Sequence, residues 1–200
     1  MEALSQLRKS CSWPSIYYDC VDRLIKLTNA QVVLEIGVAY GLHAEHLLER
    51  FPALIYYGID PFKAGYDPND GFVRDVHMAY KDINEQISMD NLYKDVTKSI
   101  NQNYPIRSCI TRATLSECSN LFPKEFFDFI FIDGDHRYEA VKKDLNNSLA
   151  LVKKNGVLAG DDYDWQDVAK AVDIFASEHD LKIDFINGEN GHKIWYSKLN

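Results

Sequence analysis

The segment at 127–133, Phe-Asp-Phe-Ile-Phe-Ile-Asp, most constrains how this chain can fold. It is almost continuously apolar, so a strand here must be covered on both faces. That pattern is typical of a parallel strand inside an α/β sheet, with helices packed above and below it. Four other short apolar segments predict strands of the same sheet, at 32–36, 54–60, 106–111 and 157–160.

Segments with helical periodicity alternate with these strands. A first helix is expected at 14–27, with Ser12 as its cap, Pro14 in its first turn and Asn29 at its end. Apolar residues spaced three and four apart predict further helices after the first, fourth and fifth strands. The dipeptide Asn155-Gly156 is expected to stop the helix that follows the fourth strand.

The C-terminal tail completes the predicted sheet with strands at 182–186 and 193–196, around a turn rich in Asn and Gly. The fold class is therefore α/β, with a doubly wound, mostly parallel, seven-stranded sheet and an antiparallel edge strand. A length of 200 residues suits a single domain, 1–200. Residues 61–103 are interpreted as a helical insert, whose apolar side chains keep a helical period at Phe72, Val76, Ile83 and Ile87.

Composition excludes several classes of protein. The net charge of −8 argues against a nucleic-acid partner, because no basic run offsets the repulsion between the chain and phosphate. No apolar run approaches the roughly 20 residues that cross a bilayer, and the first residues do not resemble a signal peptide. The four cysteines, at 11, 20, 109 and 118, form no Cys-x-x-Cys pair. They fit reduced thiols in the cytoplasm.

A glycine turn follows the first predicted strand. Gly37 allows a sharp turn with a ligand against the backbone, and Gly41 allows close approach where the next helix begins. The spacing lacks the Gly-x-Gly-x-x-Gly pattern that holds a pyrophosphate. Asp60 ends the second strand, where a carboxylate can accept hydrogen bonds from both ribose hydroxyls. Together they indicate an adenosine-containing ligand, although such turns are also merely structural and Asp60 can instead cap the turn at Pro61-Phe62.

Acidic residues gather after the fourth and fifth strands. If these strands are neighbours, Asp133, Asp161 and Asp162 meet at one edge of the sheet, where their repulsion requires a cation or a proton. Oxygen ligands favour a hard ion, and Mg²⁺ is the natural candidate. The alternative is that Asp161 and Asp162 cap the helix near Trp165, and that Asp135 stabilises the start of the helix after the fourth strand.

His136 lies three residues after Asp133 and could overhang a metal ion at this edge. A neutral imidazole takes up a proton near neutral pH, which makes His136 a candidate general base. The alternative is that it bonds to the backbone of the Asp133 loop. The other histidines without a comparable setting are interpreted as surface residues: His46, His77, His179 and His192.

The segments Val-Leu-Glu-Ile-Gly-Val-Ala-Tyr-Gly and Gly-Ile-Asp-Pro-Phe resemble the first two motifs of class I S-adenosylmethionine-dependent methyltransferases, which have a Rossmann-like fold. The resemblance implies that the glycine turn lies against the methionine part of the cofactor and that Asp60 holds the ribose. His43 departs from the pattern, since metal-dependent relatives commonly have a small hydroxyl residue there that bonds to the cofactor carboxylate. His43 either takes over that contact or is a helix-surface residue. The implied cofactor-binding set is Glu35, Gly37, Gly41, His43, Asp60, Ala113, Thr114 and Asp133.

The later motifs, Asp-Gly-Asp-His-x-Tyr and then Asp-Asp-Tyr, resemble the metal-dependent O-methyltransferase branch that includes macrolide-sugar and catechol enzymes. This resemblance implies that Asp133, Asp161 and Asp162 ligate Mg²⁺ or another hard divalent cation and that His136 is the base. The expected reaction is O-methylation of a small-molecule hydroxyl, on a sugar or a phenol. Candidate contacts of this acceptor are Tyr66, Asp67, Tyr163 and Trp165.

Three other functions stay open at this point. The chain could be a hydroxylase-like member of the same fold, a cofactor-binding module without catalysis, or a nicotinamide oxidoreductase. The glycine spacing argues against the last of these. A homo-oligomer is also left open, and no nucleic-acid or membrane partner is expected.

Overall fold

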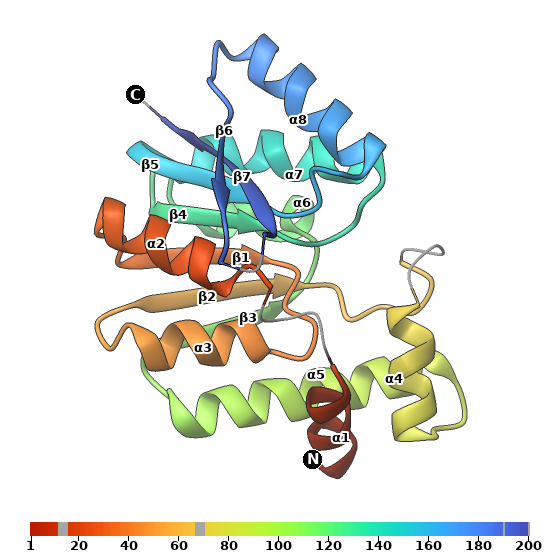
Figure 1. The fold of residues 1–200 in the computed structure, drawn as a ribbon. Coiled ribbons are helices and arrows are strands. Elements are labelled where there is room, and N and C mark those ends of the chain that lie inside the picture. The colour runs from red at the N-terminus through yellow and green to blue at the C-terminus, as the bar shows by residue number, and fades with distance from the viewer. Residues whose placement is uncertain (12–15, 67–70, 190, 200) are drawn as a thin grey trace.

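The computed structural model describes residues 1–11, 16–66, 71–189 and 191–199. Seven strands form one sheet in the order β3-β2-β1-β4-β5-β7-β6 (Figure 1). Their bounds are β1 Val32–Ile36, β2 Ile55–Asp60, β3 Ser108–Arg112, β4 Phe127–Ile132, β5 Val152–Gly160, β6 Asp184–Asn187 and β7 Lys193–Lys198.

The pairing of these strands confirms the predicted fold class. Strands β1 to β5 pair in parallel, whereas β7 runs antiparallel to β5 on one side and to β6 on the other. The antiparallel strand β7 is therefore second from the edge of the sheet, and β6 forms the edge itself.

Helices cover both faces of the sheet (Figure 1). Successive side chains of a strand point to opposite faces, so Phe129 and Phe131 join one buried cluster while Ile130 and Ile132 join the other. The first cluster includes residues of α1 (Glu2–Ser10), α2 (Tyr18–Thr28), α3 (Leu42–Arg50), α4 (Phe72–Tyr80) and α5 (Glu85–Asn103). The second includes residues of α6 (Leu115–Cys118), α7 (Tyr138–Leu151) and α8 (Gln166–Glu178), and a short 3-10 helix, η1 (Ser119–Leu121), follows α6.

The prediction that Asn155-Gly156 stops a helix is wrong. Helix α7 already ends at Leu151, and β5 begins at the next residue. Asn155 has a positive φ of 64°, and the register between β4 and β5 shifts near Phe127 and Phe129. The turn-forming pair is therefore accommodated as an irregularity within a long strand.

The ends of other elements also differ from the predicted ones. Asn29 ends α2 in a left-handed conformation, as expected, whereas the proposed cap Ser12 and Pro14 lie outside the described residues. In the segment at 61–103, α4 ends at a left-handed Lys81. Ile83 therefore lies between two helices and is 92% exposed, so the single helical period assigned to this segment is wrong.

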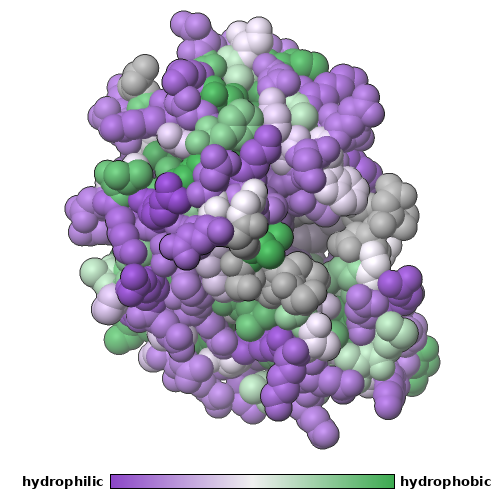
Figure 2. All heavy atoms as spheres, in the orientation of Figure 1, coloured by the Kyte–Doolittle hydropathy of each residue, from purple (hydrophilic) through white to green (hydrophobic). Residues whose placement is uncertain are grey.

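Among the described residues, no helix combines the length and apolar character needed to cross a membrane. The face in Figure 2 is largely hydrophilic, with hydrophobic residues in small groups.

Candidate active site

A cavity of about 460 Å³ opens at the carboxyl edge of the sheet. The segments that follow the five parallel strands all contribute to its wall, as expected for a ligand site in a sheet of this kind. The wall includes Gly37 after β1, Asp60 at the end of β2, Ala113 after β3, Asp133 after β4 and Asp161 after β5. The cavity therefore joins the predicted cofactor residues to the predicted acidic cluster.

The glycine turn after β1 is tied to both neighbouring strands. The backbone N–H of Gly37 donates to the carbonyl oxygen of Ile59 at 2.9 Å. Gly37 has a φ of +96°, and a Cβ atom there would lie 1.8 Å from the carbonyl oxygen of Asp133. Glycine is required at this position because the backbone after β4 passes so close to it. This requirement holds whether or not a ligand also lies against the turn.

Asp60 holds the glycine turn in place. Its Oδ2 accepts hydrogen bonds from the backbone N–H groups of Val38 and Ala39, both at 3.0 Å, and its Oδ1 accepts one from Phe62 at 2.7 Å. Burial raises the pKa of the Asp60 carboxyl, and these hydrogen bonds oppose that effect. The alternative role of Asp60 as a cap at Pro61-Phe62 is thus present, and the residue also lines the cavity.

A buried polar group lies beside the glycine turn. Nδ1 of His43 is 2.6 Å from Oε1 of Glu35, and the hydroxyl of Tyr56 donates to the other oxygen of Glu35. His43 is only 4% exposed, so it is not a helix-surface residue. It lines the cavity, and its Nε2 has no hydrogen-bond partner among the described residues. A buried polar atom without a partner marks a place where a ligand can bind.

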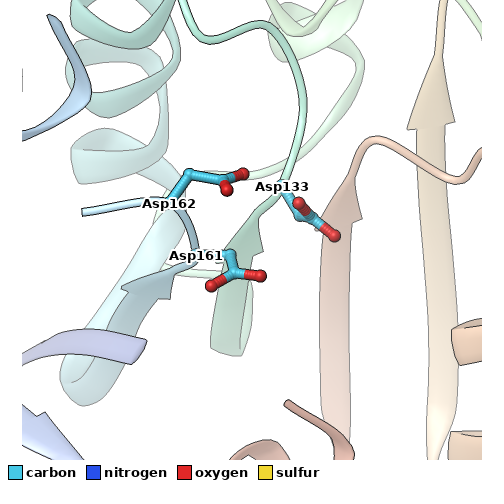
Figure 3. A group of neighbouring side chains, drawn as sticks. All are labelled: Asp133, Asp161 and Asp162. Carbon is cyan, nitrogen blue, oxygen red and sulfur yellow. The ribbon is translucent and has the colours of Figure 1, made fainter. Parts of the chain in front are cut away.

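Asp133, Asp161 and Asp162 come together (Figure 3), and all three line the same cavity. Asp133 follows β4 and the other two follow β5, and the pairing of Ile132 with Gly160 brings these strand ends side by side. One carboxylate oxygen from each of the three lies within 4.8 Å of the others. Burial, followed by the negative charges of its neighbours, raises the pKa of the Asp133 carboxyl; the same causes raise that of Asp161. The cluster can hold a hard divalent cation, which would offset this repulsion.

Each of these carboxylates contacts one polar aromatic side chain. The Tyr17 hydroxyl donates to Oδ2 of Asp133 at 2.7 Å. Nε2 of His136 lies 3.0 Å from Oδ2 of Asp162, and the His136 ring stacks on Trp165 with centroids 4.5 Å apart. The third contact comes from the turn between β6 and β7, where Nε2 of His192 lies 2.6 Å from Oδ1 of Asp161.

The interpretation of His192 as a surface residue is therefore wrong. Its local sequence, a glycine-rich turn, is typical of an exposed hairpin, and only the pairing of β7 with β5 brings it to the acidic cluster. Tyr17 also has no local signal of a functional residue, because it precedes α2 and lies far from Asp133 in the sequence. Of the other histidines, His46 contacts Asp22 and His77 contacts Ser88, while His179 is exposed.

Asp135 and Tyr163 do not join the acidic cluster. Oδ1 of Asp135 accepts a hydrogen bond from the backbone N–H of Arg137 at 2.8 Å, so Asp135 shapes the start of α7. Tyr163 donates to Asp173 instead of lining the cavity. Trp165, the N-cap residue of α8, makes no side-chain capping hydrogen bond, and the side chains of Asp161 and Asp162 contact His192 and His136.

Two of the candidate acceptor contacts, Tyr66 and Trp165, line the cavity. Asp67 lies outside the described residues.

A sheet of this order, with a glycine turn after β1 and a cavity at its carboxyl edge, defines the fold class of S-adenosylmethionine-dependent methyltransferases. The chain belongs to a methyltransferase family, since the model of the family described as "Methyltransferase domain" matches residues 34–163. The resemblance expected from the first two motifs is confirmed. A search of the curated proteins finds no match.

Solved structures agree with this fold at low sequence identity. A Staphylococcus aureus protein described as a "putative caffeoyl-CoA O-methyltransferase" is 15% identical, with a TM-score of 0.65 over 98% of this chain and 92% of that chain. A SAM-dependent methyltransferase from Aquifex aeolicus is 15% identical, with a TM-score of 0.60 over 98% of each chain. The O-methyltransferase TomG from Streptomyces achromogenes, in complex with SAM, is 14% identical, with a TM-score of 0.60 over 100% of this chain and 90% of that chain.

Proposed function

We propose that the protein is an S-adenosylmethionine-dependent O-methyltransferase that acts on a small-molecule hydroxyl with the help of a divalent cation. The observation that carries the proposal is that the cavity beginning at the glycine turn also contains the oxygen cluster of Asp133, Asp161 and Asp162. A cofactor and a metal-bound acceptor placed in one cavity can meet.

The proposed cofactor site suits a ligand without a pyrophosphate. Gly37 has a positive φ angle and presents the backbone of the turn to the cavity. Gly41, the N-cap of α3, does not line the cavity, and a Cβ atom there would meet Val96 and Arg8 instead. We assign the amino-acid end of the cofactor to Glu35 and His43, because Nε2 of His43 is buried and without a partner among the described residues. Asp60 is assigned to the ribose.

The loop after β3 is assigned to the adenine end. Ala113 and Thr114 line the cavity there. We also keep Asp133 in the cofactor set, because it borders the cavity where the glycine turn approaches β4.

The proposed metal site is built only from carboxylate oxygens. This chemistry fits Mg²⁺ or another hard divalent cation, with substrate and water oxygens completing the shell. Asp133, Asp161 and Asp162 would hold the ion, and Tyr17 and His192 would orient the first two of them through their hydrogen bonds.

In the proposed reaction, S-adenosylmethionine would supply its sulfonium methyl group to the acceptor oxygen and leave as S-adenosylhomocysteine, and the cation would lower the pKa of the acceptor hydroxyl. His136 would take up the hydroxyl proton at a ring nitrogen, since it lies beside Asp162 at the same end of the cavity. Trp165 fixes the plane of the His136 ring by stacking.

The acceptor is proposed to be a sugar or a phenol. The aromatic side chain of Trp165 borders the cavity beside His136 and can pack against the face of either ring. Two similar solved structures, described as a "putative caffeoyl-CoA O-methyltransferase" and the O-methyltransferase TomG, agree with an oxygen acceptor. We place the reaction in the cytoplasm, because the four cysteines are scattered along the sequence and form no Cys-x-x-Cys pair.

Transfer of a labelled methyl group from S-adenosylmethionine to a panel of catechols and sugars tests the proposal. We expect transfer that EDTA abolishes and Mg²⁺ restores, with Asp161→Asn inactive and the exposed neighbour Asp164→Asn unchanged. Thermal stabilisation by NAD alone would contradict the methyltransferase function. Stabilisation by S-adenosylmethionine with no transfer to any acceptor would favour a binding module or another reaction on this fold.

A further inference from the structure

Asp144, on the second turn of α7, is a buried carboxyl that the proposed reaction does not use. It is 8% exposed and nevertheless lines the cavity. Its side chain makes no hydrogen bond to another residue in the described parts of the chain. A carboxyl buried without a partner is costly to a fold, so its position at a cavity wall points to a ligand.

Helix packing places Asp144 near the loop after β3. One turn further along α7, Nδ2 of Asn147 donates to Oγ of Ser116 in α6 at 3.0 Å. Residues one turn apart lie on the same side of a helix, so Asp144 also faces the α6 side of α7. Leu115, the first residue of α6, lines the same cavity. Asp144 therefore borders the end of the cavity that we assign to adenine.

The electrostatic surroundings favour an uncharged Asp144. Burial, followed by the negative charge of Asp135, raises the pKa of the Asp144 carboxyl to about 7, and the exposed Lys143 opposes this effect. The Arg137 guanidinium is paired with Asp135. The other titratable groups facing Asp144 are the Tyr66 hydroxyl and the Cys118 thiol, which are acids that carry no charge near neutral pH.

We propose that Asp144 recognises the edge of the cofactor's adenine ring, accepting a hydrogen bond from the N6 amino group and donating its own proton to N1. A protonated carboxyl offers one acceptor and one donor side by side, which matches the acceptor N1 and the donor N6 of adenine. This inference rests on the proposed function, because it requires an adenosine-containing cofactor in the cavity.

Binding of S-adenosylhomocysteine and of its 1-deaza analogue, measured by calorimetry at pH 6, tests the contact to N1. We expect the wild-type protein to bind the 1-deaza analogue roughly tenfold more weakly, the typical effect of losing one buried hydrogen bond. Asp144→Leu removes the contacts to both N1 and N6, so it should weaken the binding of S-adenosylhomocysteine by at least about tenfold. It should also abolish the difference in affinity between the two ligands. The exposed Glu139→Gln on the same helix is the matched control and should behave like the wild type.

Asp144→Asn supplies a second test if the leucine variant does not fold. The amide keeps a donor and an acceptor, so we expect near wild-type affinity at pH 6. Above pH 7 the wild-type affinity should fall as Asp144 ionises, by up to tenfold per pH unit, and this fall should be weaker in Asp144→Asn.

Equal discrimination of the two ligands by wild type and Asp144→Leu, or an identical pH dependence in wild type and Asp144→Asn, would overturn the inference. If the wild-type protein does not bind S-adenosylhomocysteine at all, the proposed function fails, and the inference fails with it.

Discussion

Nε2 of His192 lies 2.6 Å from Oδ1 of Asp161 and joins the turn between β6 and β7 to the end of β5. The same turn is fastened to α2, since the backbone N–H of Glu189 donates to Asp19 and Arg23 donates to the carbonyl oxygen of Asn187. Tyr17, just before α2, contacts Asp133. Helix α2 and the C-terminal turn thus together support two of the three clustered carboxylates.

Replacing His192 tests whether this support matters for metal binding. His192→Ala should weaken the apparent affinity for Mg²⁺ by about 10- to 100-fold, the usual effect of removing a group that orients a metal ligand. Affinity for S-adenosylhomocysteine should stay within about twofold of wild type in the absence of metal. His179→Ala is a suitable control because His179 is exposed on α8's far end. An unchanged metal affinity in His192→Ala would show that the contact is only structural.

His136→Ala tests the proposed base. Loss of a positioned base should lower the turnover number by about 10²- to 10⁴-fold, with little change in cofactor affinity, because His136 lies at the acidic end of the cavity. Single-turnover kinetics and calorimetry with S-adenosylhomocysteine separate these effects. A large loss of cofactor binding with normal chemistry would assign His136 to the architecture of the loop instead.

Gly37 and Gly65 allow strain and steric overlap to be separated. Both have positive φ angles, but a Cβ atom at Gly37 would overlap the Asp133 backbone, whereas one at Gly65 would meet nothing within 4 Å. Gly65→Ala should lower the free energy of unfolding by about 1 kcal/mol from backbone strain alone. Gly37→Ala should lower the free energy of unfolding by more than about 3 kcal/mol, since the packed backbone at Asp133 must move. Urea denaturation measures both, and equal losses would contradict the close approach.

The buried carboxyl of Asp144 predicts a pH-dependent stability. Its pKa of about 7 in the folded protein exceeds the unfolded value, so the folded state binds this proton more tightly. Asp144 therefore loses stabilising free energy as the pH rises from about 4 to 7, by at most about 4 kcal/mol.

Asp144→Asn cannot ionise, so it should gain stability relative to wild type over this range and hold the gain above pH 7. Urea denaturation of both proteins between pH 4 and 8 gives the difference between their free energies of unfolding. The contributions of the other titrating groups largely cancel in this difference. A difference that does not depend on pH would mean that Asp144 is well solvated.

The parts of the fold that the sequence predicts well are those with local causes. The strand at β4 follows from an apolar segment, and the glycine turn from Gly37 and its neighbours. The convergence of Asp133 with Asp161 and Asp162 follows from one assumption, that β4 and β5 are adjacent.

The errors arise where distant segments decide the outcome. Asn155-Gly156 has the composition of a turn, but pairing of β5 with β4 keeps it within a strand. His192 and Tyr17 have no local signature of a functional residue, because their contacts with the acidic cluster form only when the ends of the chain pack together. Helix α1 precedes the first helix that the sequence predicts, and it packs on α4 and α5.

The most direct test of the central claim is equilibrium binding of Mn²⁺, followed by electron paramagnetic resonance in the presence of S-adenosylhomocysteine. We predict one tightly bound ion per wild-type chain, lost in Asp161→Asn and retained in Asp164→Asn. Absence of a bound ion in the wild type, or undiminished binding in Asp161→Asn, would contradict a metal site at the ends of β4 and β5.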